Sequence, residues 1–253
     1  MQVSIWDEYY MLNKFQAIKG RKIKFALVGC GRIAANHIAS IKAHQETSEL
    51  VAVCDIDAAN LKKVVIETGA KGYAYLSEML ADGGFDAVII TSPSGLHPLQ
   101  TIECAESGFH VITEKPMATK WVDGMEMVRA CDKAGVRLFV VKQNRRNATI
   151  QLLKQAIDSG RFGRIYSVAC NVFWTRPQEY YDAATWRGTW EFDGGAFMNQ
   201  ASHYVDLLDW LIGPVESVQS YTATLARNID VEDSGVLALR WRNGALGTMN
   251  VSM

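Results

Sequence analysis

A lysine between an acidic residue and a proline is the residue of this sequence best suited to chemistry. Glu114-Lys115-Pro116 follows the apolar run 109–113, which has the length of a buried strand. Ligands bind at the carboxyl ends of strands in open α/β sheets, and a proline restricts the residue before it to extended geometry. We expect Lys115 to stabilise a developing alkoxide, and Lys115–Pro116 to be a candidate cis bond. The alternative is an ordinary surface lysine.

Asn199 and His203 are four residues apart in a segment predicted to form an amphipathic helix over about 195–211. Residues with this spacing share one face of a helix. A neutral imidazole takes up a proton near pH 7, so His203 is the predicted base and Asn199 the predicted anchor for a substrate hydroxyl. Asp206 has two interpretations, either orienting the His203 ring or being plain surface charge.

A glycine-rich turn is the candidate dinucleotide site. Residues 29–34 read Gly-Cys-Gly-Arg-Ile-Ala, between a predicted strand over 23–28 and a predicted helix over 33–44. The first glycine allows the tight turn, the second lets the backbone approach a pyrophosphate, and the alanine lets helix and strand pack closely. The alternative is a turn that binds no ligand. The predicted cofactor contacts here are Gly29, Gly31, Arg32 and Ile33.

Asp55 ends the next predicted strand and indicates which cofactor binds. A carboxylate there accepts hydrogen bonds from the ribose hydroxyls and repels a 2′-phosphate, which favours NAD over NADP. Arg32 argues in the other direction, because it would attract that phosphate. His97 has two interpretations, contacting the cofactor or simply opening a helix. The remaining predicted cofactor contacts are Asp55, Thr91, Ser92, His97, Glu114, Lys115 and Gln143.

Strand-length apolar runs alternate with helix-period segments from residue 22 to residue 143, which predicts parallel βαβ units with both sheet faces covered. The predicted strands are 23–28, 50–54, 87–90, 110–113 and 138–141, and the predicted helices lie near 33–44, 58–68, 97–107 and 121–134. The predicted helix caps are Asp57 and Ser77 at amino ends and Gly69, Gly108 and Gly135 at carboxyl ends.

The pattern changes after residue 144 to strands grouped around a few helices, which predicts an α+β domain. Its predicted elements are a helix over 149–158, a strand over 164–174, an aromatic and arginine-rich loop over 175–193, the helix over 195–211, and antiparallel strands from 215 with a turn at 242–244.

We therefore predict an α/β protein with an N-terminal Rossmann dinucleotide-binding domain over 21–143 and an α+β substrate domain with a mainly antiparallel sheet over 144–253. Residues 1–20 are predicted to form an extension that packs as a surface helix. The sequence stops within a strand pattern at 251–253, so we expect the second domain to be truncated at its C-terminus.

Composition excludes several classes of protein. A formal net charge of −1 argues against a nucleic-acid or anionic-membrane surface as the main partner. No stretch is long and apolar enough to span a bilayer, and residues 1–20 do not have the pattern of a signal peptide. The 5 cysteines lack paired spacing, which suits a reducing cytoplasm. We assign no metal site.

These motifs resemble the Gfo/Idh/MocA family of sugar and cyclitol oxidoreductases, and the resemblance covers residues 21–253. It rests on residues 29–34, the loop from Ser92-Pro93 to His97, Glu114-Lys115-Pro116, and the Gly-Gly segment that leads to His203. Many members carry Asp-x-x-x-His on the last helix, where this sequence has Asn199. An asparagine holds a hydroxyl but cannot act as a carboxylate base, so the base role moves towards His203.

Three segments, 141–147, 171–177 and 191–200, resemble one subgroup more closely, the UDP-2-acetamido-2-deoxy-glucuronate 3-dehydrogenases. The resemblance implies NAD-dependent oxidation of the C3 hydroxyl of a UDP-linked N-acetylhexosaminuronate in lipopolysaccharide sugar synthesis. It also implies a homo-oligomer, a tetramer in the family, and 2-oxoglutarate as a second substrate.

Such a substrate carries a diphosphate and a carboxylate, which arginine forks bind well, and rings that aromatic side chains stack on. For several of the aromatic residues, plain loop packing is the simpler interpretation. Two alternatives stay open for the whole chain: a relative acting on an inositol, a free aldose or another nucleotide sugar, and an inactive NAD-binding fragment or redox sensor. The predicted substrate contacts are Lys115, Asn144, Arg145, Arg146, Trp174, Arg176, Tyr181, Asn199 and His203.

Overall fold

The computed structural model of the protein describes residues 18–253. The helix predicted within residues 1–20 therefore lies outside the described part, apart from residues 18–20. The chain divides into two compact units, one up to Val88 and one from Ile89 to Met253, and each is described by itself. The predicted domain boundaries after residues 20 and 143 stay predictions.

A six-stranded sheet in the order β3-β2-β1-β4-β5-β6 has the strand order of a Rossmann fold. The pairs β1–β2, β2–β3 and β5–β6 run parallel. All four residues of β4 are buried, as expected for a central strand covered on both faces. The strands are β1 Ile23–Val28, β2 Ser48–Cys54, β3 Lys71–Tyr73, β4 Ala87–Ile90, β5 His110–Thr113 and β6 Leu138–Val140.

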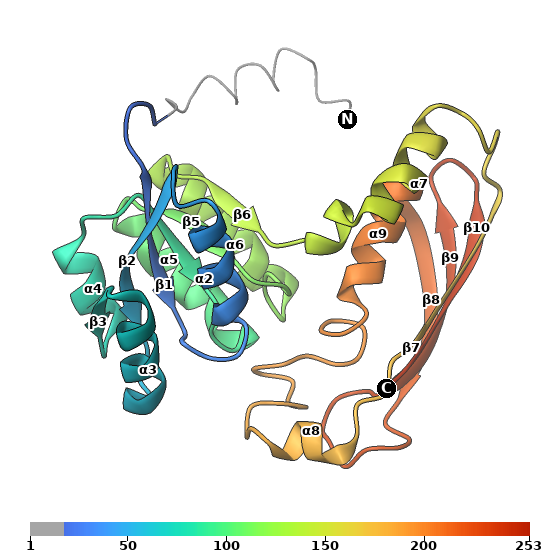
Figure 1. The fold of residues 1–253 in the computed structure, drawn as a ribbon. Helices are drawn as coiled ribbons and strands as arrows, with labels where there is room; N and C mark the ends of the chain where they lie inside the picture. Colours follow the sequence, from blue (N-terminus) through green and yellow to red (C-terminus); the bar gives the residue numbers. More distant parts are fainter. Residues whose placement is uncertain (1–17) are drawn as a thin grey trace. The chain divides into compact units, whose positions relative to one another are not determined.

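Helices lie between these strands in the alternation that the sequence predicts (Figure 1). In the first unit, Leu27 and Val53 from the sheet pack with Ile38 and Val64 from the helices. In the second unit, Ala105 of α5 packs against Cys131 of α6. The helices are α2 Ala34–Ala43, α3 Ala58–Thr68, α4 Leu76–Asp82, the short η1 Ser94–Leu96, α5 His97–Glu106 and α6 Trp121–Ala134.

The predicted helix caps are mostly confirmed. The Asp57 side chain accepts hydrogen bonds from the N–H groups of Ala59 and Asn60, both at 2.9 Å, and Gly69 and Gly135 end their helices in left-handed geometry. Gly108 also has a positive φ, one residue after the Ser107 cap. Ser77 is wrong as a cap, because α4 begins before it and no side chain caps that helix.

A four-stranded sheet in the order β7-β10-β9-β8 forms the core of the remainder of the second unit. β10 runs antiparallel to β9 and β9 antiparallel to β8, whereas β7 runs parallel to β10. Helices α7 and α9 cover one face of this sheet (Figure 1). The elements are η2 Gln143–Arg146, α7 Ala148–Asp158, β7 Ser167–Phe173, α8 Gln178–Asp182, α9 Ser202–Ile212, β8 Val215–Ala223, β9 Ser234–Trp241 and β10 Leu246–Ser252.

Helix α9 begins at Ser202, seven residues later than the predicted start at 195. The preceding segment finds partners outside a helix. The Ala196 N–H donates to the Glu232 carbonyl at 2.9 Å, and the Phe197 N–H donates to the Glu232 carboxylate at 3.1 Å. Asn199 therefore lies in a turn, and the prediction that it shares a helical face with His203 is wrong.

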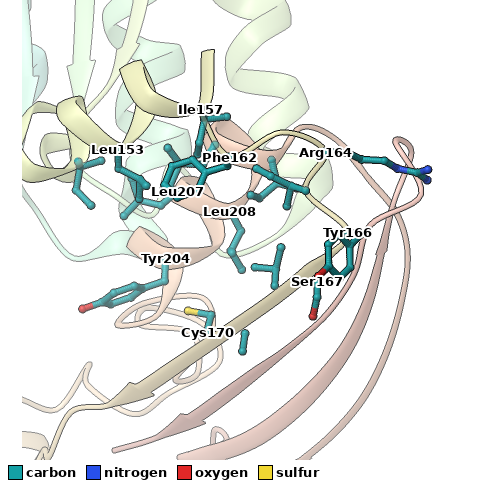
Figure 2. A pocket seen from close by; sticks show the side chains of 16 residues that line it. Leu153, Ile157, Phe162, Arg164, Tyr166, Ser167, Cys170, Tyr204, Leu207 and Leu208 are labelled. Atoms are coloured by element: carbon teal, nitrogen blue, oxygen red, sulfur yellow. The ribbon is translucent and has the colours of Figure 1, made fainter. Parts of the chain in front are cut away.

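An apolar cavity of about 640 Å³ lies between α7, β7 and α9. Figure 2 shows Leu153, Ile157, Leu207 and Leu208 around it. None of the predicted site residues lines it, and its walls are largely aliphatic. It is therefore not the site of the polar chemistry that the sequence predicts.

Candidate active site

The glycine turn between β1 and α2 has the shape that a dinucleotide needs. Gly29 has φ of +91°, a conformation that glycine adopts at little cost. A Cβ built on Gly31 meets nothing within 4 Å, so open space lies beside its backbone, and Ala34 is buried at the start of α2. These residues fit a pyrophosphate lying against the turn. Arg32 is exposed and Ile33 is the half-buried residue before α2.

Asp55 is fixed at the carboxyl end of β2 by two backbone donors. Its carboxylate accepts from the Cys30 N–H at 2.6 Å and from the Asp57 N–H at 2.8 Å. One oxygen therefore braces the glycine turn. A carboxylate oxygen has more than one acceptor direction, so both oxygens keep capacity for ribose hydroxyls, and the donor set fits the adenosine half of NAD.

His97 begins α5, which confirms the helix-opening interpretation. Its Nδ1 lies 2.8 Å from the Pro116 carbonyl oxygen and its Nε2 lies 3.0 Å from the Ser92 carbonyl oxygen. The buried ring thus ties the loop after β4 to the turn after β5, and burial lowers the pKa of His97. A cofactor contact by His97, Ser92 or the buried Thr91 stays a prediction.

Lys115 lies within the second unit, two residues after the end of β5, and its peptide bond to Pro116 is cis. Its Nζ donates to both the backbone oxygen and the side-chain Oδ1 of Asn199, each at 3.0 Å. Burial lowers the pKa of Lys115 to about 8, against the opposing charges of Glu114 and Asp193. The ammonium is therefore ionised at neutral pH but close to losing its proton.

Asp193 completes this group, although the sequence did not single it out. It is only 1% exposed. Its Oδ1 accepts from the Asn199 Nδ2, and its Oδ2 accepts from the Gly188 N–H at 2.7 Å. Burial raises the pKa of Asp193. An acidic residue directly before Gly194 and Gly195 was the available signal in the sequence, but such a triplet equally indicates a turn.

His203 lies in the first turn of α9 and is 7% exposed. Within residues 18–253, its Nδ1 has no hydrogen-bond partner. Burial lowers the pKa of His203 to about 4, and the positive charges of Lys115 and Lys142 lower it further. The ring is therefore neutral at physiological pH, with a buried nitrogen available to a ligand.

Asp206 neither orients His203 nor acts as plain surface charge, so both interpretations are wrong. Its carboxylate accepts two bonds from Arg145, from Nε at 2.8 Å and from Nη2 at 2.6 Å, and Lys142 lies 4.0 Å away. Arg145 was predicted to bind a substrate anion, but this bidentate pair occupies its guanidinium face. Gln143 and Arg146 are exposed, and Asn144 is half-buried.

The aromatic loop holds two arginines around Tyr180. The Arg176 guanidinium lies 4.1 Å from the Trp174 ring centre and 5.3 Å from that of Tyr180. Arg187 lies 4.3 Å from the Tyr180 ring centre. In the described part of the chain, the buried Nε atoms of both arginines lack hydrogen-bond partners. They are donors available to an anion, and Arg187 was missed in the sequence.

Tyr181 is buried, and its burial raises the pKa of the phenol to about 12. It therefore stays neutral. Among the described residues there is no group of three or more His, Cys, Asp or Glu side chains that could hold a metal ion. No helix among them is long and apolar enough to cross a membrane.

Two family models together match most of the chain. The model described as oxidoreductase family, NAD-binding Rossmann fold (GFO_IDH_MocA), matches residues 23–142, and the GFO/IDH/MocA C-terminal domain matches residues 150–253. Both lie within the range of the predicted resemblance.

Two solved structures are highly similar. The WlbA dehydrogenase from Chromobacterium violaceum, in complex with NADH and UDP-GlcNAcA, is 71% identical with a TM-score of 0.92, over 93% of this chain and 68% of that one. The Bordetella pertussis WlbA dehydrogenase, crystallised with the same molecules, is 66% identical with a TM-score of 0.92, over 94% and 68%.

Curated relatives are more distant. The myo-inositol 2-dehydrogenase of Thermotoga maritima is 26% identical over 91% of this chain and 68% of its own length. The D-apiose dehydrogenase of Rhizobium rhizogenes is 28% identical over 91% and 66%. The chain thus spans about two thirds of the length of the proteins it matches.

Proposed function

The chain belongs to the Gfo/Idh/MocA family of oxidoreductases, and on this premise we propose that it is an NAD-dependent dehydrogenase of a UDP-linked sugar. The substrate is UDP-GlcNAcA, a UDP-linked N-acetylhexosaminuronate, and the reaction turns its C3 hydroxyl into a ketone. Identities of 71% and 66% to dehydrogenases that bind this sugar support the choice. The curated inositol and apiose dehydrogenases are 26% and 28% identical, which supports those substrates less.

One observation carries the proposal: one unit holds a buried ammonium and a neutral imidazole, and the charge of the ammonium acts on the imidazole. The Lys115 charge lowers the pKa of His203, and Lys115 is held by Asn199 three residues before α9 begins. Oxidation of an alcohol needs a base for the hydroxyl proton and a positive group for the oxygen. These two side chains supply both.

Each residue has its own role in the proposed reaction. The neutral His203 ring accepts the C3 hydroxyl proton at its Nδ1. The Lys115 ammonium donates a hydrogen bond to the same oxygen as negative charge develops there. Asn199 holds Lys115 and orients the sugar. NAD, when bound, accepts the hydride from C3, and Gly29, Gly31 and Asp55 would hold its adenosine diphosphate half.

The anionic parts of the substrate need cations that the protein has not already neutralised. Arg176 and Arg187 fit this need, because their buried Nε atoms have no partner among the described residues. Arg145 is a weaker choice, since Asp206 already engages it through two bonds. Trp174, Tyr181, Asn144 and Arg146 remain our proposed neighbours of the sugar nucleotide.

The proposed setting is cytoplasmic synthesis of a lipopolysaccharide sugar by a homo-oligomer. In this setting 2-oxoglutarate serves as a second substrate that reoxidises the reduced cofactor. Adding 2-oxoglutarate to enzyme, sugar and a trace of NAD should then give 2-hydroxyglutarate in step with the keto sugar. Absence of 2-hydroxyglutarate would limit the proposal to the dehydrogenase half-reaction.

The direct test mixes the protein with NAD and UDP-GlcNAcA and follows NADH absorbance together with the mass of the sugar nucleotide. The expected result is NADH formation and a product lighter by two hydrogens. UDP-GlcNAc, which lacks the carboxylate, and myo-inositol serve as controls and should react far more slowly. Faster turnover of myo-inositol would point to a cyclitol dehydrogenase. NAD binding without turnover of any sugar would favour the inactive-fragment alternative.

A further inference from the structure

Asp193 has contacts that go beyond holding a loop together. One of its oxygens accepts from the Gly188 N–H at 2.7 Å, which braces the loop. The other accepts from the Asn199 Nδ2. An amide that donates with its nitrogen presents its oxygen on the opposite side, and that oxygen accepts from the Lys115 ammonium at 3.0 Å. A continuous chain of hydrogen bonds thus joins a buried carboxylate to the proposed catalytic lysine.

We infer that Asp193 is a positioning residue that orients the Asn199 amide and, through it, holds the Lys115 ammonium in place. The inference rests on the proposed role of Lys115. Without a carboxylate at 193, the Asn199 amide loses the acceptor on its nitrogen side and is oriented by the Lys115 ammonium alone. The flipped amide would turn its NH₂ group towards the ammonium, where it cannot accept a hydrogen bond.

The charge of Asp193 has a second consequence. The charged groups that act on Lys115 are Glu114, Asp193, Lys142 and Arg176. Glu114 and Asp193 favour its charged form, whereas the two cations oppose it. Because Asp193 is 1% exposed, little solvent screens its charge. Asp193 thus helps to keep Lys115 protonated in spite of burial, which lowers its pKa to about 8.

A purely structural role for Asp193 makes a different prediction. If Asp193 only braces Gly188 and its neighbours, replacing it by asparagine lowers stability or turnover without changing how Lys115 titrates. If it acts on Lys115, the isosteric Asp193→Asn change moves the titration of Lys115 to lower pH by about one unit.

The experiment titrates the Lys115 side chain by NMR of the protein labelled with isotopic lysine, with the signal assigned by the Lys115→Arg variant. Four proteins are compared: the unaltered chain, Asp193→Asn, the Asp193→Asn/Asn199→Asp double variant and Asp233→Asn. Asp233 is the matched control, because it is 0% exposed and braces a loop through three backbone N–H groups. It is not among the charges that act on Lys115.

The expected result is a lower titration midpoint for Lys115 in Asp193→Asn and an unchanged midpoint in Asp233→Asn. In the double variant the carboxylate stands directly against the ammonium, so the midpoint returns to the original value or exceeds it. The pH at which kcat falls on the alkaline side should shift in each variant in the same direction as the Lys115 midpoint. Because the NMR titration needs no substrate, it is readable even if UDP-GlcNAcA is not turned over.

An unchanged Lys115 midpoint in folded Asp193→Asn would overturn the inference. If that variant does not fold, Asp193→Ser, which removes the charge with a smaller polar side chain, decides. An unchanged Lys115 midpoint in Asp193→Ser would then overturn the inference, and a lower midpoint supports it.

Discussion

At the scale of single residues, the site combines a charged amine, Lys115, with an uncharged imidazole, His203. Burial is the main cause that lowers both pKa values, Lys115 to about 8 and His203 to about 4. Because both pKa values are lowered, the pH range in which Lys115 is charged and His203 is neutral stays wide, and it includes neutral pH. Repulsion by the positive charges of Lys115 and Lys142 adds to the effect of burial in keeping the His203 ring unprotonated.

This arrangement predicts the pH dependence of kcat/KM. Below a pH of about 4 His203 is protonated and cannot take the hydroxyl proton, so the rate falls as pH drops through that value. Above a pH of about 8 Lys115 loses its charge, so the rate falls as pH rises through it. Initial rates across this range test it. An acid limb at the ordinary histidine value of about 6.5 would contradict the environment described for His203.

Removing the proton acceptor should slow the chemical step. We expect His203→Asn to lower kcat by about 10²–10⁴-fold and Lys115→Ala to abolish most turnover while NAD binding is largely kept. Steady-state kinetics and calorimetric titration with NAD measure the two effects. The exposed His44 offers a matched control, and His44→Asn should retain full activity. Near-normal NADH formation by His203→Asn would remove His203 from the mechanism.

Asp55 predicts the cofactor preference. Its carboxylate should repel a 2′-phosphate, so the protein should bind NAD more tightly than NADP. Asp55→Asn keeps the shape of the side chain and removes its charge, and we expect the NAD-to-NADP affinity ratio to fall by about tenfold. Calorimetric titration with both cofactors gives the ratio. Tighter binding of NADP by the unaltered protein would refute the argument.

Individual residues show what a sequence can predict about such a site. Lys115 was recognisable because a strand end and a proline flank it, and His203 because glycines precede its helix. The Asp193–Asn199 contact was not predictable, since it depends on a turn whose geometry is fixed by the distant Glu232. The role of Asp206 was wrong for a similar reason: its partner, Arg145, is 61 positions away in the sequence.

At the scale of elements, the segment before α9 determines where Asn199 lies. A Cβ added to Gly195 would overlap the Glu232 carboxylate, which is the group that keeps the Phe197 N–H out of the helix. The backbone of this segment therefore approaches a charged side chain at a distance that only glycine permits. Strong helical periodicity in the sequence was overridden by this contact.

Gly195→Ala should consequently destabilise the second unit, by about 1–3 kcal/mol as for other overpacked sites, and should lower turnover by displacing Asn199. Gly31→Ala is the matched comparison, because its added Cβ meets nothing within 4 Å. It should leave stability unchanged and weaken NAD binding instead. Urea unfolding and NAD titration of both variants separate the effects. Equal stability of the two variants would show that the Glu232 contact does not shape the turn.

Short elements were the ones that sequence patterns missed. The strand Lys71–Tyr73 has three residues and one glycine, too few for a hydrophobic run, and α4 and α8 span fewer than three turns each. The long apolar strands and the helices between them were confirmed, because a strand that is buried on both faces is a continuous run of apolar residues in the sequence.

At the scale of the whole molecule, the alternating pattern predicted the parallel βαβ units, the six-stranded sheet shows their strand order, and the two family models show the family. That β7 runs parallel to β10 could not be predicted, because about seventy residues separate them and no local signal sets which strands pair. Periodicity alone predicts the fold and not the activity. The activity is indicated by the match to both family domains and by the high identity to two dehydrogenases crystallised with UDP-GlcNAcA.

The most direct test of the central claim is a crystal structure of this protein with NAD and UDP-GlcNAcA bound. We expect the C3 hydroxyl oxygen to lie about 3 Å from both the Lys115 Nζ and a ring nitrogen of His203, with the C3 hydrogen facing the nicotinamide ring. A sugar bound with C3 away from these two side chains, or with another carbon in that place, would contradict it.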